Sequence, residues 1–153
     1  MTAAVFAALH ILGAGLLLAA FVAEYLLFRP PFNPDRARAV VLADILYGVA
    51  AALLILTGVI RALYLGKGAA YYLGHPLFHA KLFVFLIVGL LSIGPTRRFI
   101  TWRKQLGRGE TPALDEAAAQ GIRRRLRLEL IGVALIVLLA SLMARGIGLD
   151  SGS

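Results

Sequence analysis

Four apolar stretches, each long enough to cross a lipid bilayer, decide what this chain can fold into. They cover residues 4–28, 39–65, 76–93 and 128–146. A membrane span needs about 20 mainly apolar residues, because the hydrocarbon core of a bilayer is about 30 Å thick. So few segments must form helices, since an open sheet would leave backbone groups unpaired in lipid. The sequence therefore predicts an all-α fold: an integral membrane four-helix transmembrane bundle built from a single domain, residues 1–153.

Composition supports a membrane protein and excludes several other classes. The chain is 60% hydrophobic and 16% charged, whereas a soluble domain is about 45–50% apolar and about 25% charged. The net charge of +8 comes from basic residues that border the apolar stretches. We interpret them as loop charge that sets orientation, so the expected partner is the lipid bilayer and no nucleic acid. The chain has no cysteine, which excludes disulfides, thiolate metal sites and thiol catalysis.

Lysine and arginine are distributed unevenly between the loops. Twelve lie in the connections after the first and third spans, and three lie at the opposite end of the spans. Because cytoplasmic loops carry the excess of positive charge, both termini should lie outside the cytoplasm, in an N-out/C-out topology. The basic loop and helix at 95–127 would then be cytoplasmic, with Phe99 and Trp102 as interface anchors. We expect a multi-pass protein of the bacterial inner (cytoplasmic) membrane.

Capping and turn residues predict where the helices begin and end. Gly94 and Pro95 should end the third span, because proline lacks a backbone donor and clashes with the preceding turn. Thr111 and Pro112 are typical of a helix start, with a capping hydroxyl followed by proline at the first helical position. This helix should run through the basic residues 123–127 into the fourth span.

Two ionisable side chains, His10 and Lys81, lie at matching depth in the first and third spans. His10 is six residues past Ala4 and Lys81 is five past Pro76. At 1.5 Å per residue, each lies on the order of 8 Å below the outer boundary. Because a charged group in a membrane span is costly, such residues mark a functional site by default. We expect the two side chains to share one site.

The residues around His10 suit a haem b or porphyrin site. A neutral imidazole is a good haem or metal ligand, and Gly13 beside His10 would leave room for a flat ring. Arg61 and Arg145, or Lys67 in the neighbouring loop, could pair with propionates. Lys81 could be a second ligand or a carboxylate partner, and His79 lies slightly nearer the surface. The predicted role is redox chemistry with a porphyrin or quinone-type partner.

Other interpretations of the same residues stay open. Imidazole and thioether ligands suit copper, so His10, His79 and Met143 could form a copper or other metal site in a binding protein or permease. Alternatively, His10 could be a hydrogen-bonded histidine that joins two helices, and Lys81 could extend to the outer headgroups. The chain would then be a non-catalytic small membrane subunit or scaffold. His75 and His79 could both lie at the membrane interface.

A second polar group is expected near the cytoplasmic side. It consists of the carboxylates Glu24, Asp44 and Glu129, with Arg97 and Arg98 in reach. Carboxylates beside arginines near the ends of spans usually form interhelical ion pairs, and we favour that interpretation over a proton route. The glycine and alanine faces of the spans allow a homo-oligomer but do not require one.

Several segments resemble an uncharacterised bacterial family of small four-span membrane proteins, and together they cover nearly the whole chain. They include KGAAYYLGHP, HAKLFVFLIVGLLSIGPTRRFITWR and RLRLEL. Two shorter segments, ALHILG and FHAKLFVFLIVGLL, are similar to the HemJ-type protoporphyrinogen oxidase. That resemblance implies a four-span haem-binding protein in which His10 and Lys81 are the important residues. Four-span copper-transport proteins of the CopD type share an apolar core with histidines.

Overall fold

The computed structural model describes residues 1–65 and 68–147, and the described part is helical throughout its regular elements. Four helices are long and apolar enough to cross a membrane. The predicted all-α four-helix bundle is therefore confirmed. The elements are α1 (Thr2–Leu27), α2 (Pro34–Ile60), η1 (Arg61–Leu65), α3 (Ala69–Leu73), α4 (Pro76–Gly107) and α5 (Glu116–Ala144).

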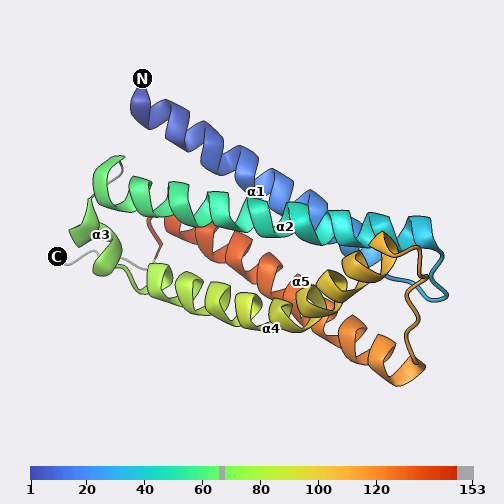
Figure 1. The fold of residues 1–153 in the computed structure, drawn as a ribbon. Coiled ribbons are helices and arrows are strands. Elements are labelled where there is room, and N and C mark those ends of the chain that lie inside the picture. Colours follow the sequence, from blue (N-terminus) through green and yellow to red (C-terminus); the bar gives the residue numbers. More distant parts are fainter. Residues whose placement is uncertain (66–67, 148–153) are drawn as a thin grey trace.

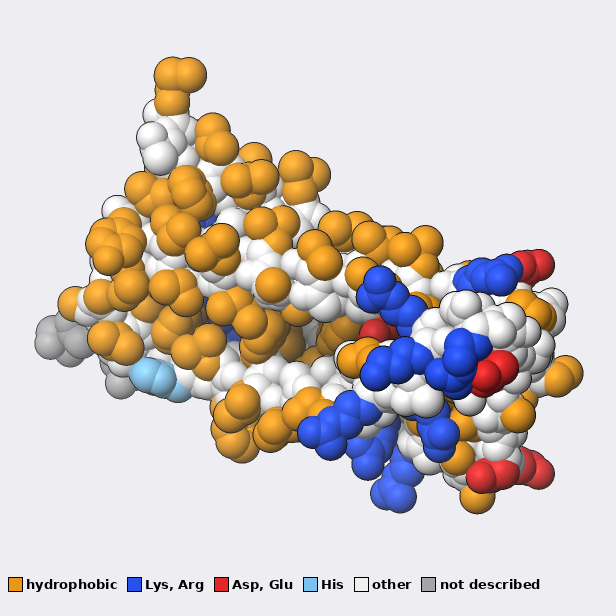
Figure 2. All heavy atoms as spheres, viewed as in Figure 1, with side chains coloured by type: hydrophobic (Ala, Val, Ile, Leu, Met, Phe, Trp, Pro, Cys, Tyr) orange, Lys and Arg blue, Asp and Glu red, His pale blue; other side chains and the backbone are white. Residues whose placement is uncertain are grey.

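The bundle is built from two antiparallel helix pairs. α1 packs along α2, α4 packs along α5, and α2 also packs against α4 (Figure 1). The start of α1, the end of α5 and the short helix α3 lie at one end, which we call the α3 end. The connections from α1 to α2 and from α4 to α5 lie at the other end. Lysine and arginine side chains gather there, so we call it the basic end (Figure 2).

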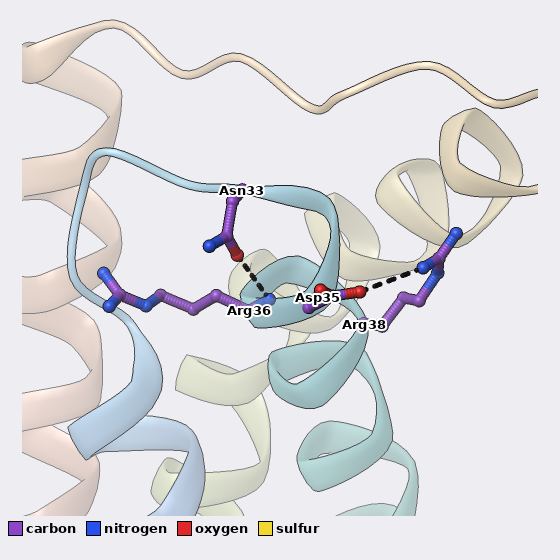
Figure 3. A network of polar contacts seen from close by, with 4 residues as sticks. All are labelled: Asn33, Asp35, Arg36 and Arg38. Carbon is purple, nitrogen blue, oxygen red and sulfur yellow. Dashed lines mark hydrogen bonds and ion pairs between the residues drawn. The ribbon is translucent and has the colours of Figure 1, made fainter.

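The start of α2 follows from its local sequence. Asn33 caps the helix, because its Oδ1 accepts a hydrogen bond from the backbone N–H of Arg36 at 2.8 Å (Figure 3). Pro34 occupies the first turn, where its missing donor costs nothing. Asp35 and Arg38 form an exposed ion pair at 3.1 Å. These contacts end the connection from α1 and set the direction of α2.

The start of α5 lies later than the capping pattern predicted. Asp115, and not Thr111, caps this helix, because its Oδ1 accepts from the backbone N–H of Ala118 at 2.7 Å. Pro112 is buried in the connection before the helix and not in its first turn. Both Thr111 and Asp115 can cap a helix, so local chemistry did not distinguish them.

α4 does not end at Gly94 and Pro95 as predicted. Pro95 is buried inside the helix, which continues to Gly107 and has 32 residues. At 1.5 Å per residue it is about 48 Å long, well beyond a hydrocarbon core of about 30 Å. Tertiary packing overrides the local break, because Phe99 and Trp102 beyond the proline are 0% and 1% exposed. They are core residues and not the interface anchors expected from the sequence.

An aromatic cluster fills the basic end of the bundle. The ring centroids of Phe28 and Phe99 are 5.9 Å apart, and those of Phe32 and Trp102 are 4.6 Å apart. Phe28 also stacks on Trp102 at 6.2 Å. Since these residues come from the end of α1, the following connection and α4, the cluster joins both helix pairs. It also closes the bundle interior on this side.

Glycine permits the close packing of α4 on α5. A Cβ atom built on Gly132 would overlap the side chain of Val88, which is 4% exposed. A Cβ on Gly94 would overlap the guanidinium of Arg125 in the same way. Both contacts join α4 to α5, but only Gly132 limits the separation of these helices, because the guanidinium end of Arg125 is flexible.

Candidate functional site

His10 is held by Thr57 across the interface of α1 and α2. The distance from Nδ1 of His10 to Oγ1 of Thr57 is 2.8 Å, and Thr57 is 1% exposed. The Thr57 hydroxyl donates its single proton to the carbonyl of Leu53 at 2.7 Å. Its oxygen must therefore accept from His10, which places the imidazole proton on Nδ1. In the neutral ring, Nε2 keeps its lone pair and can bind a ligand.

Two glycines lie near this histidine, and their contacts differ from the flat-ring space that the sequence predicted. Gly13 is buried against α2, and a Cβ there would lie 3.3 Å from the Leu53 side chain. The flat-ring space predicted beside Gly13 is thus filled by a helix contact. Gly58 instead lies against the imidazole, since its added Cβ would be 3.3 Å from Cε1 of His10. Thr57 was not predicted as a partner of His10, because the sequence pattern of a single chain does not show contacts between helices.

Two basic side chains approach His10. Arg61 of η1 and Lys81 of α4 both act electrostatically on its ring. Within the described residues α1 packs against η1 but not directly against α4, so a site shared by His10 and Lys81 stays a prediction. Nζ of Lys81 also lies 5.3 Å from the ring centroid of Phe78, within range of a cation–π contact. The π-helical winding of η1 carries Arg61, and such turns often occur at functional sites. We call His10, Thr57, Arg61 and Lys81 the outer basic cluster.

The outer basic cluster has no acidic partner in the described residues. Ion pairs within residues 1–65 and 68–147 join only Asp35 to Arg38 and Glu110 to Arg108. Both pairs lie at the basic end, one at the start of α2 and one in the connection from α4 to α5. Arg61 and Lys81 are each half-buried, so their positive charges are only partly hydrated. An anionic ligand would therefore find two uncompensated cations beside a histidine with a free Nε2.

Several predicted site residues do not join this cluster. His79 is exposed, and its Nε2–H donates to the carbonyl of Leu73 at 2.7 Å. Arg145 is exposed at the end of α5, and Met143 is half-buried there. Lys67 lies outside the described residues. Within the described ranges, no three His, Cys, Asp or Glu side chains are arranged to hold a metal ion.

His75, which could lie at the membrane interface according to the sequence, is buried within the protein. It is 0% exposed, and its ring centroid is 5.6 Å from that of Tyr71. Neither ring nitrogen has a hydrogen-bond partner within the described part of the chain. His75 immediately precedes α4, so burial of the chain turn between α3 and α4 accounts for its position. In the sequence, this burial was indicated only by Tyr71, the aromatic residue four positions earlier that contacts the His75 ring.

Three carboxyl groups converge inside the bundle nearer the basic end. Glu24 of α1, Asp44 of α2 and Glu129 of α5 are 2%, 7% and 1% exposed. They act electrostatically on one another, and Tyr47 faces all three. Oδ1 of Asp44 accepts a hydrogen bond from the hydroxyl of Thr96 at 2.6 Å, so α4 also contributes. We call Glu24, Asp44 and Glu129 the carboxyl cluster.

Arginines do not neutralise the carboxyl cluster. Arg97 and Arg98 are exposed, and neither forms an ion pair within the described residues. Oε2 of Glu24 and Oε1 of Glu129 are buried without a hydrogen-bond partner in that same part. The cation that acts on Glu129 is Arg125, whose guanidinium lies against Gly94. Direct interhelical ion pairs, favoured from the sequence, are therefore not what this group forms.

The carboxyl cluster is closed off from the basic end. Phe28 follows Glu24 by four residues and Phe99 follows Thr96 by three, which places the aromatic cluster about one helical turn beyond the carboxyls. Phe28 and Phe99 are 1% and 0% exposed. Neighbouring carboxyls can exchange protons with one another and with a Tyr47 hydroxyl nearby. The aromatic cluster therefore lies between the carboxyl cluster and the basic end.

Comparison with known proteins identifies the family. No curated protein and no solved structure matches this chain. The resemblance to an uncharacterised family of small four-span membrane proteins is confirmed by a family model that covers nearly all of the sequence. Because that model matches residues 2–148, the chain belongs to the family described as Predicted membrane protein (DUF2214).

Proposed function

We propose that this protein binds haem b in the membrane and has a redox role, with His10 as the axial ligand. The observation that carries the proposal is the hydrogen bond between His10 and Thr57. Haem-ligating and metal-ligating histidines commonly donate their second ring N–H to a neighbouring group, which fixes the tautomer and the ring orientation. Thr57 does this for His10 and leaves Nε2 as the ligand atom.

The charge of the outer basic cluster fits the same ligand. Haem b carries two propionate groups, and Arg61 and Lys81 supply two positive charges beside His10 without a carboxylate partner in the described residues. The cation–π contact of Lys81 with Phe78 favours a charged amine, which would pair with a carboxylate. The alternative role for Lys81 is a second ligand. Arg145 and Met143 at the end of α5 lie on the same end of the bundle.

These contacts give each residue of the outer basic cluster a role in the proposed haem site. Thr57 orients the imidazole of His10, and Gly58 lacks the Cβ that would crowd the ring. Arg61 and Lys81 would pair with the propionate carboxylates of haem. Bound haem would supply one-electron chemistry, either electron transfer or porphyrinogen oxidation. The neighbouring Ala14 is exposed on α1, so a porphyrin or quinone-type partner could arrive from the lipid. The proposal places the site near the non-cytoplasmic face of a bacterial inner membrane.

An absorption spectrum and a metal analysis test this function. Protein purified from cells supplied with haem should show a Soret band, and His10→Ala should lose it. Thr57→Val should weaken haem binding by about 10-fold, because it removes the group that orients the ligand. His79→Ala is the matched control, since that exposed ring bonds only to Leu73 within the described part, and its spectrum should match wild type. A Soret band that is unchanged in His10→Ala would refute the assignment.

The same measurements separate the other candidates. Stoichiometric copper without porphyrin would favour a copper-binding protein or permease, although His79 is engaged by Leu73 and exposed. A colourless, metal-free protein whose melting temperature survives replacement of both His10 and Lys81 would favour a small subunit or scaffold. Either result would remove haem b from the proposal.

The carboxyl cluster favours a second function, the passage or storage of protons. Three carboxyls are buried together, and two of their oxygens lack a hydrogen-bond partner in the described residues. Ionisable groups inside membrane spans often form proton relays. Liposomes that contain the protein and a trapped pH indicator test this directly. Proton flux under an applied potential should fall in Glu24→Gln and Glu129→Gln, and Glu116→Gln on the exposed start of α5 should leave it unchanged. Equal flux with and without protein would exclude the passage of protons.

A further inference from the structure

A groove runs along the outside of the bundle between α4 and α5. Its volume is about 500 Å³. Aliphatic side chains form most of its wall, and Ile87, Leu90 and Leu128 are 41%, 58% and 44% exposed. Arg124 and Arg125 line the remaining part, and both are exposed. The groove therefore presents an apolar wall and a doubly charged end to the surroundings of the protein.

The position of this groove matches the boundary of the membrane. Ile87 and Leu90 belong to the apolar half of α4, and Leu128 begins the apolar half of α5. Arg124 and Arg125 lie one turn earlier in α5, toward the basic end where the lysine and arginine side chains gather (Figure 2). The aliphatic wall is thus at the depth of acyl chains, and the two guanidinium groups are at the depth of headgroups.

A smaller groove between α2 and α4 repeats this design. Its volume is about 290 Å³, and it combines two arginines, Arg38 and Arg103, with aliphatic side chains such as Leu42 and Ile45. Arg38 is already paired with Asp35 at 3.1 Å. By contrast, Arg124 and Arg125 have no carboxylate within ion-pair distance in the part of the chain that the structure describes. The groove between α4 and α5 has the larger volume, and its two arginines form no ion pair within the described residues.

We propose that the groove between α4 and α5 binds an anionic phospholipid of the cytoplasmic leaflet. The phosphate would lie at Arg124 and Arg125, and an acyl chain would lie along Ile87, Leu90 and Leu128. A guanidinium group can donate two parallel hydrogen bonds to the oxygens of one phosphate. Basic pockets between membrane helices bind anionic headgroups. Gly94 allows the guanidinium of Arg125 to lie against α4, which places this exposed cation beside the groove. The proposal does not depend on haem binding.

Gly121 provides a way to block the groove without touching its charges. It lines the groove, and a Cβ built on it meets no atom within 4 Å. Gly121→Phe should therefore fill the groove while the helix and both arginines stay in place. It complements Arg124→Gln/Arg125→Gln, which removes the charges and leaves the apolar wall.

Native mass spectrometry of the full chain, exchanged into detergent with defined lipids, tests the proposal. The probes are phosphatidylglycerol and phosphatidylethanolamine with identical acyl chains. Wild type should retain phosphatidylglycerol preferentially, and the double variant should weaken that binding by roughly 30-fold, from about 1 kcal/mol for each arginine. Gly121→Phe should weaken it as well. Arg97→Gln/Arg98→Gln is the matched control, because it removes the same charge from exposed residues outside both grooves.

Three results would overturn the proposal. Equal retention of the two lipids would show that charge does not select the occupant. Equal losses in Arg124→Gln/Arg125→Gln and Arg97→Gln/Arg98→Gln would show a diffuse charge effect without a site. A dimer in wild type that both Gly121→Phe and the Arg124/Arg125 variant abolish would show that a second copy of the chain fills the groove. Retained preference in Arg97→Gln/Arg98→Gln, with loss in the two groove variants, supports the lipid site.

Discussion

The imidazole of His10 depends on a buried hydroxyl. Thr57 accepts from Nδ1 of His10 and donates to the carbonyl of Leu53, so it satisfies two groups at once. Thr57→Val keeps the shape of the side chain but leaves the Nδ1–H without its acceptor. We expect a loss of about 1 kcal/mol in the free energy of unfolding, the usual net contribution of one hydrogen bond, because the His10 donor is half-buried. Thermal unfolding in detergent measures this change.

Two control variants separate the hydrogen bond from the general effect of a substitution. Thr57→Ser keeps the hydroxyl and should stay close to wild type. Thr101→Val removes an exposed hydroxyl that bonds only to the carbonyl of Arg97 in its own helix, at 3.2 Å within the described residues. It should change stability by less than about 0.5 kcal/mol. Equal unfolding midpoints for Thr57→Val and Thr57→Ser would show that the bond to His10 contributes nothing.

Glu129 should be a residue whose amide replacement stabilises the protein. It is 1% exposed, its Oε1 lacks a partner in the described residues, and it faces Glu24 and Asp44. Glu129→Gln keeps the shape and removes an ionisable carboxyl group, whose ionisation is made costly by burial and by its neighbours. We expect a gain of about 1 kcal/mol in the unfolding free energy. Glu116→Gln on the exposed start of the same helix should be neutral, and a lower midpoint for Glu129→Gln would mean that the carboxylate is needed for packing.

At the scale of the elements, the spacing of α4 and α5 rests on Gly132. A Cβ there would overlap Val88, which is buried at 4% exposure. Gly132→Ala should therefore destabilise the pair by about 1–3 kcal/mol, the usual cost of overpacking. Gly89→Ala is the control on α4, because its Cβ would meet no atom within 4 Å, and it should be neutral or stabilising. The double variant Gly132→Ala/Val88→Ala should recover most of the loss, and a failure to recover would exclude this contact as the cause.

The sequence predicted the elements well where a single physical requirement dominates. Long apolar stretches must be helical in lipid, so all four long helices were found. Helix ends were less predictable, because they depend on packing between elements. Pro95 is accommodated inside α4 because Phe99 and Trp102 beyond it are buried with Phe28. Thr111 carried the same capping signal as Asp115, and only the fold selects between them.

For the candidate site, the sequence indicated how deep each residue lies in the bundle but not the direction in which its side chain points. Residue counting placed His10 and Lys81 at one depth, and in the structure Lys81 acts electrostatically on the His10 ring without direct packing of α4 on α1. Depth does not reveal which way a side chain faces across a helix pair. Gly13 consequently proved to be a contact with Leu53, and Thr57 was not anticipated as the partner of His10. To predict the carboxyl cluster and the outer basic cluster, one would need to know how each helix is rotated about its own axis.

The whole molecule separates its charged groups along one axis. The outer basic cluster lies toward the α3 end, the carboxyl cluster lies in the interior, and the aromatic cluster and most lysines and arginines lie at the basic end. His10 and Glu24 are fourteen residues apart in α1, or about 21 Å along the helix axis. Electrostatic effects between the two clusters should therefore be small. The proposed redox and proton functions would therefore belong to two separate sites in one bundle.

The orientation of this axis in the membrane can be tested because the chain has no cysteine. The excess of lysine and arginine predicts a cytoplasmic basic end. Thr111→Cys marks the connection from α4 to α5, and Leu73→Cys marks α3, where Leu73 is 64% exposed. In intact spheroplasts, a membrane-impermeant maleimide should label Leu73→Cys, and Thr111→Cys should react only after permeabilisation. The reverse pattern would place the outer basic cluster on the cytoplasmic side, and the groove at Arg124 and Arg125 would then face the outer leaflet.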